Sequence, residues 1–247
     1  MAGTGTDAAG AGGLWHRADL VWHHAFGVQP LPPQWLVLGG GLLALVVVGS
    51  PRVWPAARTV VTIVHEGGHA LVALATGRHL TGVRVYRSTA GETASRGRAE
   101  GLGVVLTAVA GYLAPPLLGL GAAALLATGH VTGMLLLALL LLAGLAVAVR
   151  NAYGMLAVLA ALVAVAAVCL YGSALVQEGF GYVATWFLLL GGVRPVIELA
   201  RERRRGGRRS DADHLARLTP VPGGAWVVIF GLVALAALAV SARWLVR

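Results

Sequence analysis

The chain has 247 residues, of which 57% are hydrophobic and 12% charged, and its mean hydropathy is +0.78. This balance excludes an ordinary soluble domain and indicates an integral membrane protein. The net charge of +9 comes from 19 arginines, and the tendency of basic loops to stay in the cytoplasm explains it without a nucleic acid partner. Cys169 is the single cysteine, which excludes a disulfide framework and a cysteine metal site.

The first part of the sequence differs from the rest. The N-terminal 30 residues lack a basic start followed by an apolar core and a cleavage site, so no removable signal peptide is expected in this interfacial segment, residues 1–33. Their tryptophans and histidines are typical of a segment at the membrane interface, and we assign no metal role to His16, His23 or His24. We expect residues 34–247 to form one membrane-embedded domain. Arginine as the only basic residue, with abundant alanine and glycine, favours a bacterial source.

The remaining sequence is dominated by apolar stretches long enough to cross a bilayer, which takes about 20 residues. The sequence predicts an all-α polytopic protein of six or seven transmembrane helices. The candidates cover about 35–49, 56–76, 102–126, 131–149, 153–171, 180–197 and 223–242. With the N-terminus inside, 15 arginines fall in inner segments and four, Arg52, Arg58, Arg243 and Arg247, fall outside. This asymmetry predicts that residues 78–100 and 198–222 are cytoplasmic.

The second candidate span carries His65-Glu66-Gly67-Gly68-His69, a match to H-E-x-x-H. Helical residues four apart lie on one face, so His65 and His69 can bind one Zn²⁺. Glu66 can then act as the general base of a metalloprotease. It is the only acidic residue well inside a candidate span, where an ionisable group indicates a functional site. The competing interpretation is two neutral histidines beside a protonated glutamate.

The next elements are a predicted β-hairpin and a proline-containing span. Residues 79–100 mix short apolar stretches with Gly, Thr and Ser, which predicts a hairpin at the cytoplasmic face. Pro115 and Pro116 lie within the third span, where they predict either a kink beside the metal or a kink that only eases packing. We interpret the basic run Arg201–Arg209 as a solvated loop near lipid headgroups.

A hydrolytic zinc site takes three protein ligands, so two histidines need a third partner. Glu178 falls on the outer side of the membrane and is poorly placed. Asp211 and Asp213 lie on the cytoplasmic side before the last span, and we favour Asp211 with Asp213 as the alternative. Ser210 and Asp213 also fit a helix cap, so a purely structural role for this segment remains a competing interpretation.

The sequence around His65–Ala70 resembles the site-2 protease group of intramembrane zinc metallopeptidases, and most closely its M50B-like branch. Residues 110–116 (AGYLAPP) look like the Gly-Pro segment near the active site of that group. Asp211-Ala212 is the nearest match to the group's Leu-Asp-Gly motif, although Ala212 replaces the glycine. The resemblance implies a Zn²⁺ site in which an aspartate joins the two histidines.

From these features we expect a multi-pass zinc endopeptidase of the cell membrane, with its active site toward the cytoplasm. It would hydrolyse a peptide bond in or near the transmembrane segment of another membrane protein, within the lipid bilayer. The alternative is a non-catalytic scaffold or chaperone that retains the fold without stoichiometric zinc. A small-molecule transporter would need polar groups spread over several spans, which the sequence does not have. The oligomeric state and the substrate's identity are not encoded in any recognisable pattern.

Overall fold

Helices form most of the chain in the computed structural model, which describes residues 27–246. The predicted segment 1–33 therefore lies largely outside the described residues. The elements are α2 (Gln34–Gly49), α3 (Trp54–Ala75), β1 (His79–Val85), β2 (Gly91–Arg96), α4 (Leu102–Ala127), α5 (Val131–Ala148), α6 (Ala152–Tyr171), α7 (Ala174–Arg204), α8 (Asp211–Leu218) and α9 (Gly223–Leu245). This architecture confirms the predicted all-α polytopic fold with a small β-hairpin.

Five helices of the described chain, α4, α5, α6, α7 and α9, are each long and apolar enough to cross a membrane. The pair α2 and α3 meets the same criterion only when joined, and it is bent by 104° at the break between them. The first two predicted spans are therefore the two arms of one bent element. The reason is visible in the sequence, because α2 has only 16 residues and α3 carries Arg58 and the H-E-x-x-H motif. The described residues thus provide five or six spans.

The outward faces of these helices are apolar. Leu140 and Val147 of α5 and Leu156 and Val163 of α6 are more than 60% exposed. Such surfaces are costly in water, whereas lipid tails solvate them without penalty. The protein is therefore a multi-pass membrane protein.

A polar network on α7 fixes the corner between α2 and α3. The Glu198 Oε1 atom accepts hydrogen bonds from Trp54 Nε1 at 2.9 Å and from Arg194 Nε at 3.0 Å. The Arg194 guanidinium also bonds to the Val48 carbonyl at the end of α2, and it lies 4.6 Å from the Trp54 ring. Because Val48 and Trp54 flank the break, α7 holds both arms at a fixed angle.

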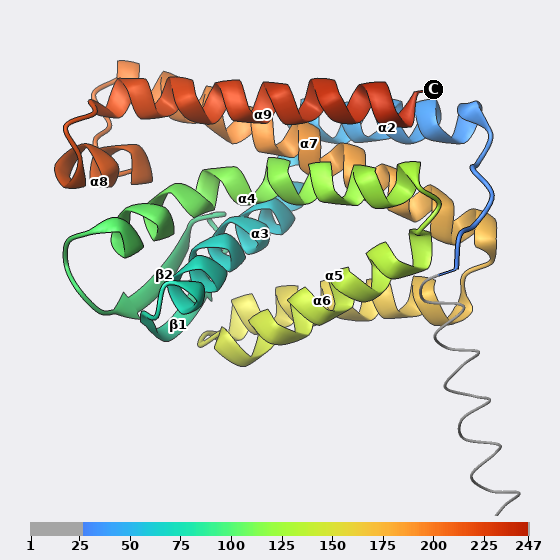
Figure 1. The fold of residues 1–247 in the computed structure, drawn as a ribbon, viewed down its shortest axis with the longest axis horizontal. Helices are drawn as coiled ribbons and strands as arrows, with labels where there is room; N and C mark the ends of the chain where they lie inside the picture. The colour runs from blue at the N-terminus through green and yellow to red at the C-terminus, as the bar shows by residue number, and fades with distance from the viewer. Residues whose placement is uncertain (1–26, 247) are drawn as a thin grey trace, which may run out of the picture.

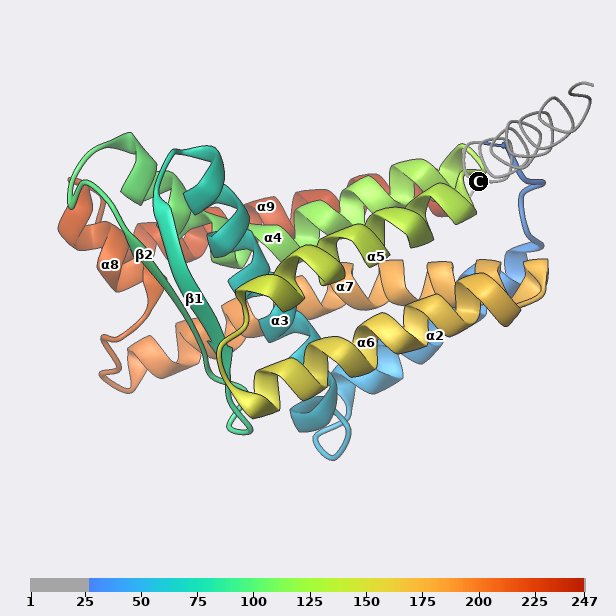
Figure 2. The same cartoon turned by 90° about the horizontal axis from the view of Figure 1, so that it is seen from below.

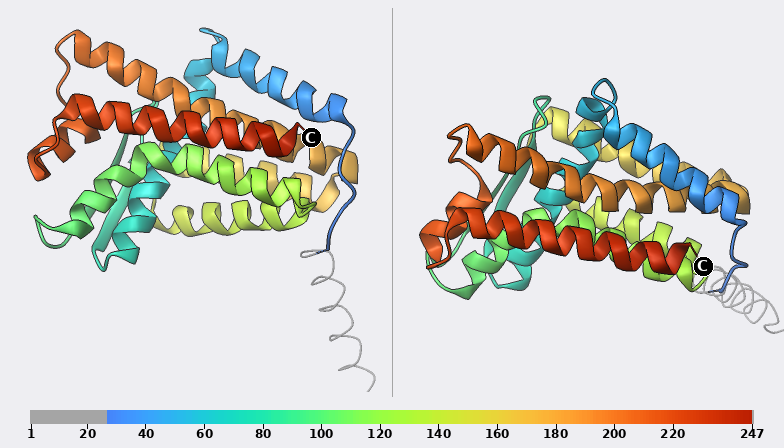
Figure 3. Two further views of the ribbon diagram at one scale, coloured as in Figure 1. Left: turned by 45° about the horizontal axis from the view of Figure 1, so that its top comes forward. Right: turned by 90° about the horizontal axis from the view of Figure 1, so that it is seen from above.

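Figures 1 and 2 show that the β-hairpin and α8 gather at one end of the helical bundle, away from the C-terminus. Figure 3 shows α2 beside α7 and α9 beside α4, and these pairs are among the most extensive helix contacts. The α4 helix continues through Pro115 and Pro116. Gly192 of α7 lies against Pro116, since a Cβ atom on Gly192 would stand 2.8 Å from the proline Cδ. Pro116 is therefore used for close packing between α4 and α7.

The β-hairpin is antiparallel, with pairing that runs from His79 opposite Arg96 to Val85 opposite Gly91. Val83 and Val85 of β1 are completely buried, which anchors the hairpin to the bundle. The outer edge of β1 is covered, because the Asn151 side chain bonds to both the N–H and the C=O of Val85, at 3.1 and 2.7 Å. Within the described chain, β1 is the only strand that pairs with β2, so the other edge of β2 carries no strand.

The crossing of α3 and α4 depends on a glycine of the motif. A Cβ atom on Gly68 would lie 2.4 Å from the Ala114 Cβ and 2.8 Å from the Ala110 carbonyl oxygen, whereas a Cβ on Gly67 would meet only Leu145 at 3.7 Å. Changing Gly68 to Ala should therefore destabilise the protein by about 1–3 kcal/mol through overpacking.

The matched variant Gly67→Ala should be neutral or slightly stabilising, because alanine favours a helix more than glycine does. The midpoints of thermal unfolding in detergent measure both effects. Equal midpoints for the two variants would contradict the close crossing at Gly68.

Candidate metal centre

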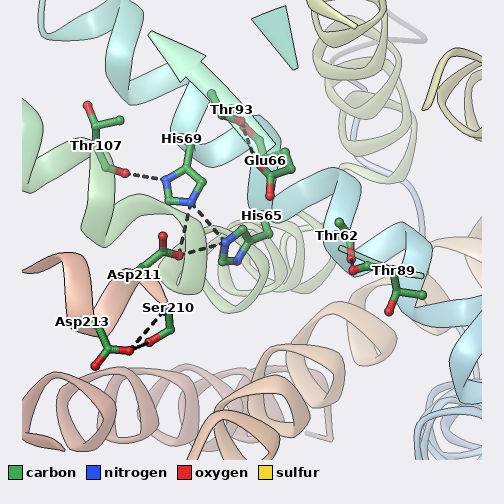
Figure 4. Close-up of polar contacts among 10 residues, drawn as sticks. All are labelled: Thr62, His65, Glu66, His69, Thr89, Thr93, Thr107, Ser210, Asp211 and Asp213. Carbon is green, nitrogen blue, oxygen red and sulfur yellow. Dashed lines mark hydrogen bonds and ion pairs between the residues drawn. The ribbon is translucent and has the colours of Figure 1, made fainter. Parts of the chain in front are cut away.

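Two histidines of α3 present nitrogen atoms to the same point. His65 and His69 are one helical turn apart, and their Nε2 atoms lie 3.1 Å from each other. The helix period brings this about, because residues i and i+4 lie on one face. The predicted pairing of the two imidazoles is therefore present in the fold (Figure 4).

The third group comes from α8. The Asp211 Oδ2 atom lies 3.1 Å from His65 Nε2 and 3.3 Å from His69 Nε2. Among the described residues, this triad is the one cluster of three His, Cys, Asp or Glu side chains with the spacing of a metal site. Glu178 is not part of it, because α7 begins at the end of the bundle remote from the hairpin (Figure 2).

The other aspartate of α8 has a different role. Asp213 Oδ2 accepts hydrogen bonds from the backbone N–H of Ser210 at 3.1 Å and from the Ser210 hydroxyl at 2.7 Å. Asp213 thus forms the predicted helix cap with Ser210, while Asp211 on the same short helix faces the histidines (Figure 4). The capping interpretation therefore applies to Asp213, and Asp211 remains the candidate third ligand.

The donor set of the triad suits a divalent cation. A tetrahedral zinc site with bonds of about 2.0–2.1 Å holds its ligand atoms about 3.3 Å apart, close to the three distances in the triad. The His69 Nδ1–H donates to the Thr107 carbonyl at 2.6 Å, so Nε2 is the ring nitrogen that faces His65 and Asp211 and that can bind a metal. One cation would satisfy the two Nε2 atoms and the carboxylate together.

The charge state of Asp211 also suits a metal ligand. Burial alone would raise the pKa of the Asp211 carboxyl, but the hydrogen bonds and charges of His65 and His69 lower that pKa far below its ordinary value. Asp211 is therefore an anion at neutral pH, which is the form that binds a metal.

Space for an ion is preserved by a glycine on α4. A Cβ atom on Gly111 would lie 2.3 Å from His69 Nε2 and 2.5 Å from His65 Nε2, which no real side chain tolerates. Gly111 belongs to the segment AGYLAPP that the sequence analysis singled out. Only glycine allows α4 to pass this close to the imidazole nitrogens.

Glu66 lies beside the triad but outside it. Its side chain is 4% exposed, and its Oε2 atom accepts a hydrogen bond from the Thr93 hydroxyl of β2 at 2.6 Å. Gly91 of β2 lies against the same carboxylate, since a Cβ there would stand 2.3 Å from Oε1. Sequence reasoning missed Thr93 and Gly91. The predicted hairpin was the only signal, and it does not reveal how β2 packs on α3.

A cavity of about 660 Å³ opens over these groups and is lined by residues of α3, β2, α4, α7 and α8. The Tyr112 ring contributes to its wall, 4.9 Å from the His65 ring, and stacks on Phe230 of α9 at 5.0 Å. The β2 residues from Gly91 to Ser95 form another part of the wall. The cavity therefore joins the triad, Glu66 and the open edge of β2 in one space.

A polytopic membrane bundle with a His-His-Asp cluster and an adjacent glutamate has the groups that a membrane metallopeptidase requires. Residues 38–241, most of the chain, match the sequence profile of the Peptidase M50B-like family. The chain belongs to this family. Neither curated proteins nor solved structures give a match to it.

Proposed function

We propose that the protein is a zinc-dependent endopeptidase that cleaves a peptide bond in or near the transmembrane segment of another membrane protein. One observation carries the proposal. Three atoms able to bind a metal, from His65, His69 and Asp211, converge with mutual distances of 3.1–3.3 Å in a member of a peptidase family. This arrangement supports a hydrolytic site more directly than a scaffold, which has no use for convergent ligands.

In this proposal His65, His69 and Asp211 would hold Zn²⁺, which would supply Lewis acidity to polarise a carbonyl and to acidify water. Glu66 accepts a proton from the attacking water and returns it to the leaving amine. The Thr93 hydroxyl donates a hydrogen bond to Oε2, which orients the carboxylate. His69 stays oriented through Thr107, as metal-binding histidines are in other proteins.

The substrate in this proposal binds in an extended form. A transmembrane helix hides its carbonyls in hydrogen bonds to the residue four positions later, so it must unwind before cleavage. The open edge of β2 lines the same cavity as the triad, and an extended peptide can add to such an edge as a further strand. This arrangement supports a membrane-protein substrate delivered along β2.

The proposed orientation places the site toward the cytoplasm. The β-hairpin and α8 lie at one end of the bundle, and the segments that contain them hold most of the arginines of the chain. Because basic segments tend to remain in the cytoplasm, this end of the bundle is the cytoplasmic end in our proposal. The expectation that Arg58 lies outside is wrong in this orientation, because Arg58 lines the same cavity as Asp211 and Arg209.

Metal analysis of the purified protein tests the proposal. We expect about one zinc per chain in the wild type and none in His65→Ala, because two ligands hold Zn²⁺ too weakly to survive purification. His214→Ala is the matched control, since His214 lines the same cavity without joining the triad, and it should keep its zinc. Zinc absent from the wild type, or unchanged in His65→Ala, would favour a non-catalytic scaffold.

A further inference from the structure

One arginine of the basic run Arg201–Arg209 is turned inward. The Arg203 side chain is 11% exposed, whereas its neighbours Arg204 and Arg205 are exposed. The interpretation of the whole run as a solvated loop is therefore wrong for Arg203. Its guanidinium pairs with the Asp213 carboxylate, which is 9% exposed. The pair is thus largely withdrawn from solvent.

This ion pair exceeds what the helix cap needs. Asp213 Oδ2 already accepts both hydrogen bonds from Ser210, so the cap is complete without the arginine. Arg203 bonds to the other oxygen, Oδ1. Burying two charges carries a desolvation cost that a simple cap would avoid, and removing one partner leaves the other charge unpaired. A buried pair at this position therefore indicates that the pair fixes the position of the elements that carry it.

The pair joins three helices. Arg203 lies at the end of α7, Asp213 in α8, and the guanidinium is covered by the first residue of α9. A Cβ atom on that residue, Gly223, would stand 2.7 Å from the arginine NH2 atom and 3.0 Å from the Ala212 carbonyl oxygen. Arg203 thus fixes α8 at its contact with α9, one residue from Asp211.

The geometry of a short helix transmits this constraint to the triad. Asp211 and Asp213 are two residues apart, which places them about 200° apart around the helix axis, on opposite faces. Figure 4 shows the two carboxylates directed away from each other. A helix of eight residues is not stable alone, so its orientation depends on such tertiary contacts. The contact between Arg203 and Asp213 therefore also sets the direction in which α8 presents Asp211.

We propose that the Arg203–Asp213 ion pair is a positioning device that holds Asp211 in place as the third ligand of the metal site. This inference rests on the proposed metal function and adds to it two residues outside the triad. It predicts that metal affinity depends on Arg203 although its guanidinium pairs with Asp213 and not with Asp211.

Titration of the full-length protein with Co²⁺ in detergent tests the inference, because Co²⁺ occupies zinc sites and its visible absorption reports the coordination geometry. We expect Asp213→Asn and Arg203→Gln to bind Co²⁺ about ten- to a hundredfold more weakly than the wild type, the usual effect of losing an outer support of a ligand. Their spectra should also lose intensity as Asp211 leaves the metal. Arg204→Gln removes an exposed neighbouring charge and should match the wild type.

Ser210→Ala separates positioning from helix capping, because it removes the hydroxyl bond and leaves the ion pair. A role limited to capping predicts that Ser210→Ala weakens Co²⁺ binding as much as Asp213→Asn and that Arg203→Gln has no effect; this result would overturn the inference. Arg203→Lys keeps the charge, so it should restore part of the affinity lost in Arg203→Gln, and the lack of any recovery would also contradict the inference.

The two proposals fail in different ways. Wild-type affinity and spectrum in both Asp213→Asn and Arg203→Gln would overturn the positioning role and leave the metal site intact. A wild type that binds no Co²⁺ would overturn both. Unfolding of the variants is detected by their elution from a sizing column, and Arg203→Lys then supplies the test in a folded protein.

Discussion

Replacing Glu66 with Gln is expected to abolish peptide cleavage while the protein keeps its zinc. Glutamine has the size of glutamate and can still accept the Thr93 hydrogen bond, but it cannot take up a proton. General base catalysis contributes about 10²- to 10⁴-fold to enzymatic rates, so activity should fall by at least that factor. The measurement is the cleavage of a pool of quenched fluorescent single-span peptides in detergent micelles, with zinc content determined on the same samples.

Glu100→Gln is the matched control for this experiment. Glu100 is an exposed glutamate between β2 and α4, and it does not line the cavity. This variant should cleave the same peptides at close to the wild-type rate. Full activity in Glu66→Gln would refute the assigned base, and a loss of zinc in that variant would show that Glu66 supports the metal site.

The second large effect is expected from Gly111→Ala, which should remove zinc and activity together. The added methyl group would stand within 2.5 Å of both Nε2 atoms, so the imidazoles or α4 must move. Because the three ligand atoms must stay within a few tenths of an ångström of tetrahedral spacing, we expect zinc affinity to fall by about a hundredfold or more.

Gly121→Ala is the control on the same helix, since a Cβ on Gly121 meets nothing within 4 Å. It should retain zinc and unfold at the wild-type temperature or slightly above. Isothermal titration of the metal-depleted proteins with zinc compares the two variants. Equal affinities would contradict the close approach of α4 to the imidazoles.

Sequence alone defines the parts of the site that depend on local geometry. The helix period places His65 beside His69, and the composition of residues 79–100 identifies the hairpin. The sequence favours Asp211 over Asp213 from its position and from the possible Ser210–Asp213 cap, and the family resemblance indicates the same residue; in the structure Asp211 is the aspartate beside the histidines. Its role as a zinc ligand stays a prediction until metal binding is measured.

The residues that support the candidate site could not be predicted from the sequence, for a physical reason. Thr93 contacts Glu66 only because β2 packs on α3 in one register, and a register shift of one residue would turn its side chain to the other face. Arg203 looks like its exposed neighbours in the sequence, and only the packing of α7, α8 and α9 distinguishes it. The separate first and second spans were predicted from hydropathy alone, which contains no information on the 104° bend between them.

The three converging groups come from distant parts of the sequence, two from α3 and one from α8. During synthesis the ribosome makes α3 first and reaches α8 only after four further long helices have been inserted. A partly made chain therefore contains the histidines and Glu66 without Asp211. Under the proposed function, the growing polypeptide cannot attack neighbouring membrane proteins, or itself, until its assembly is almost finished.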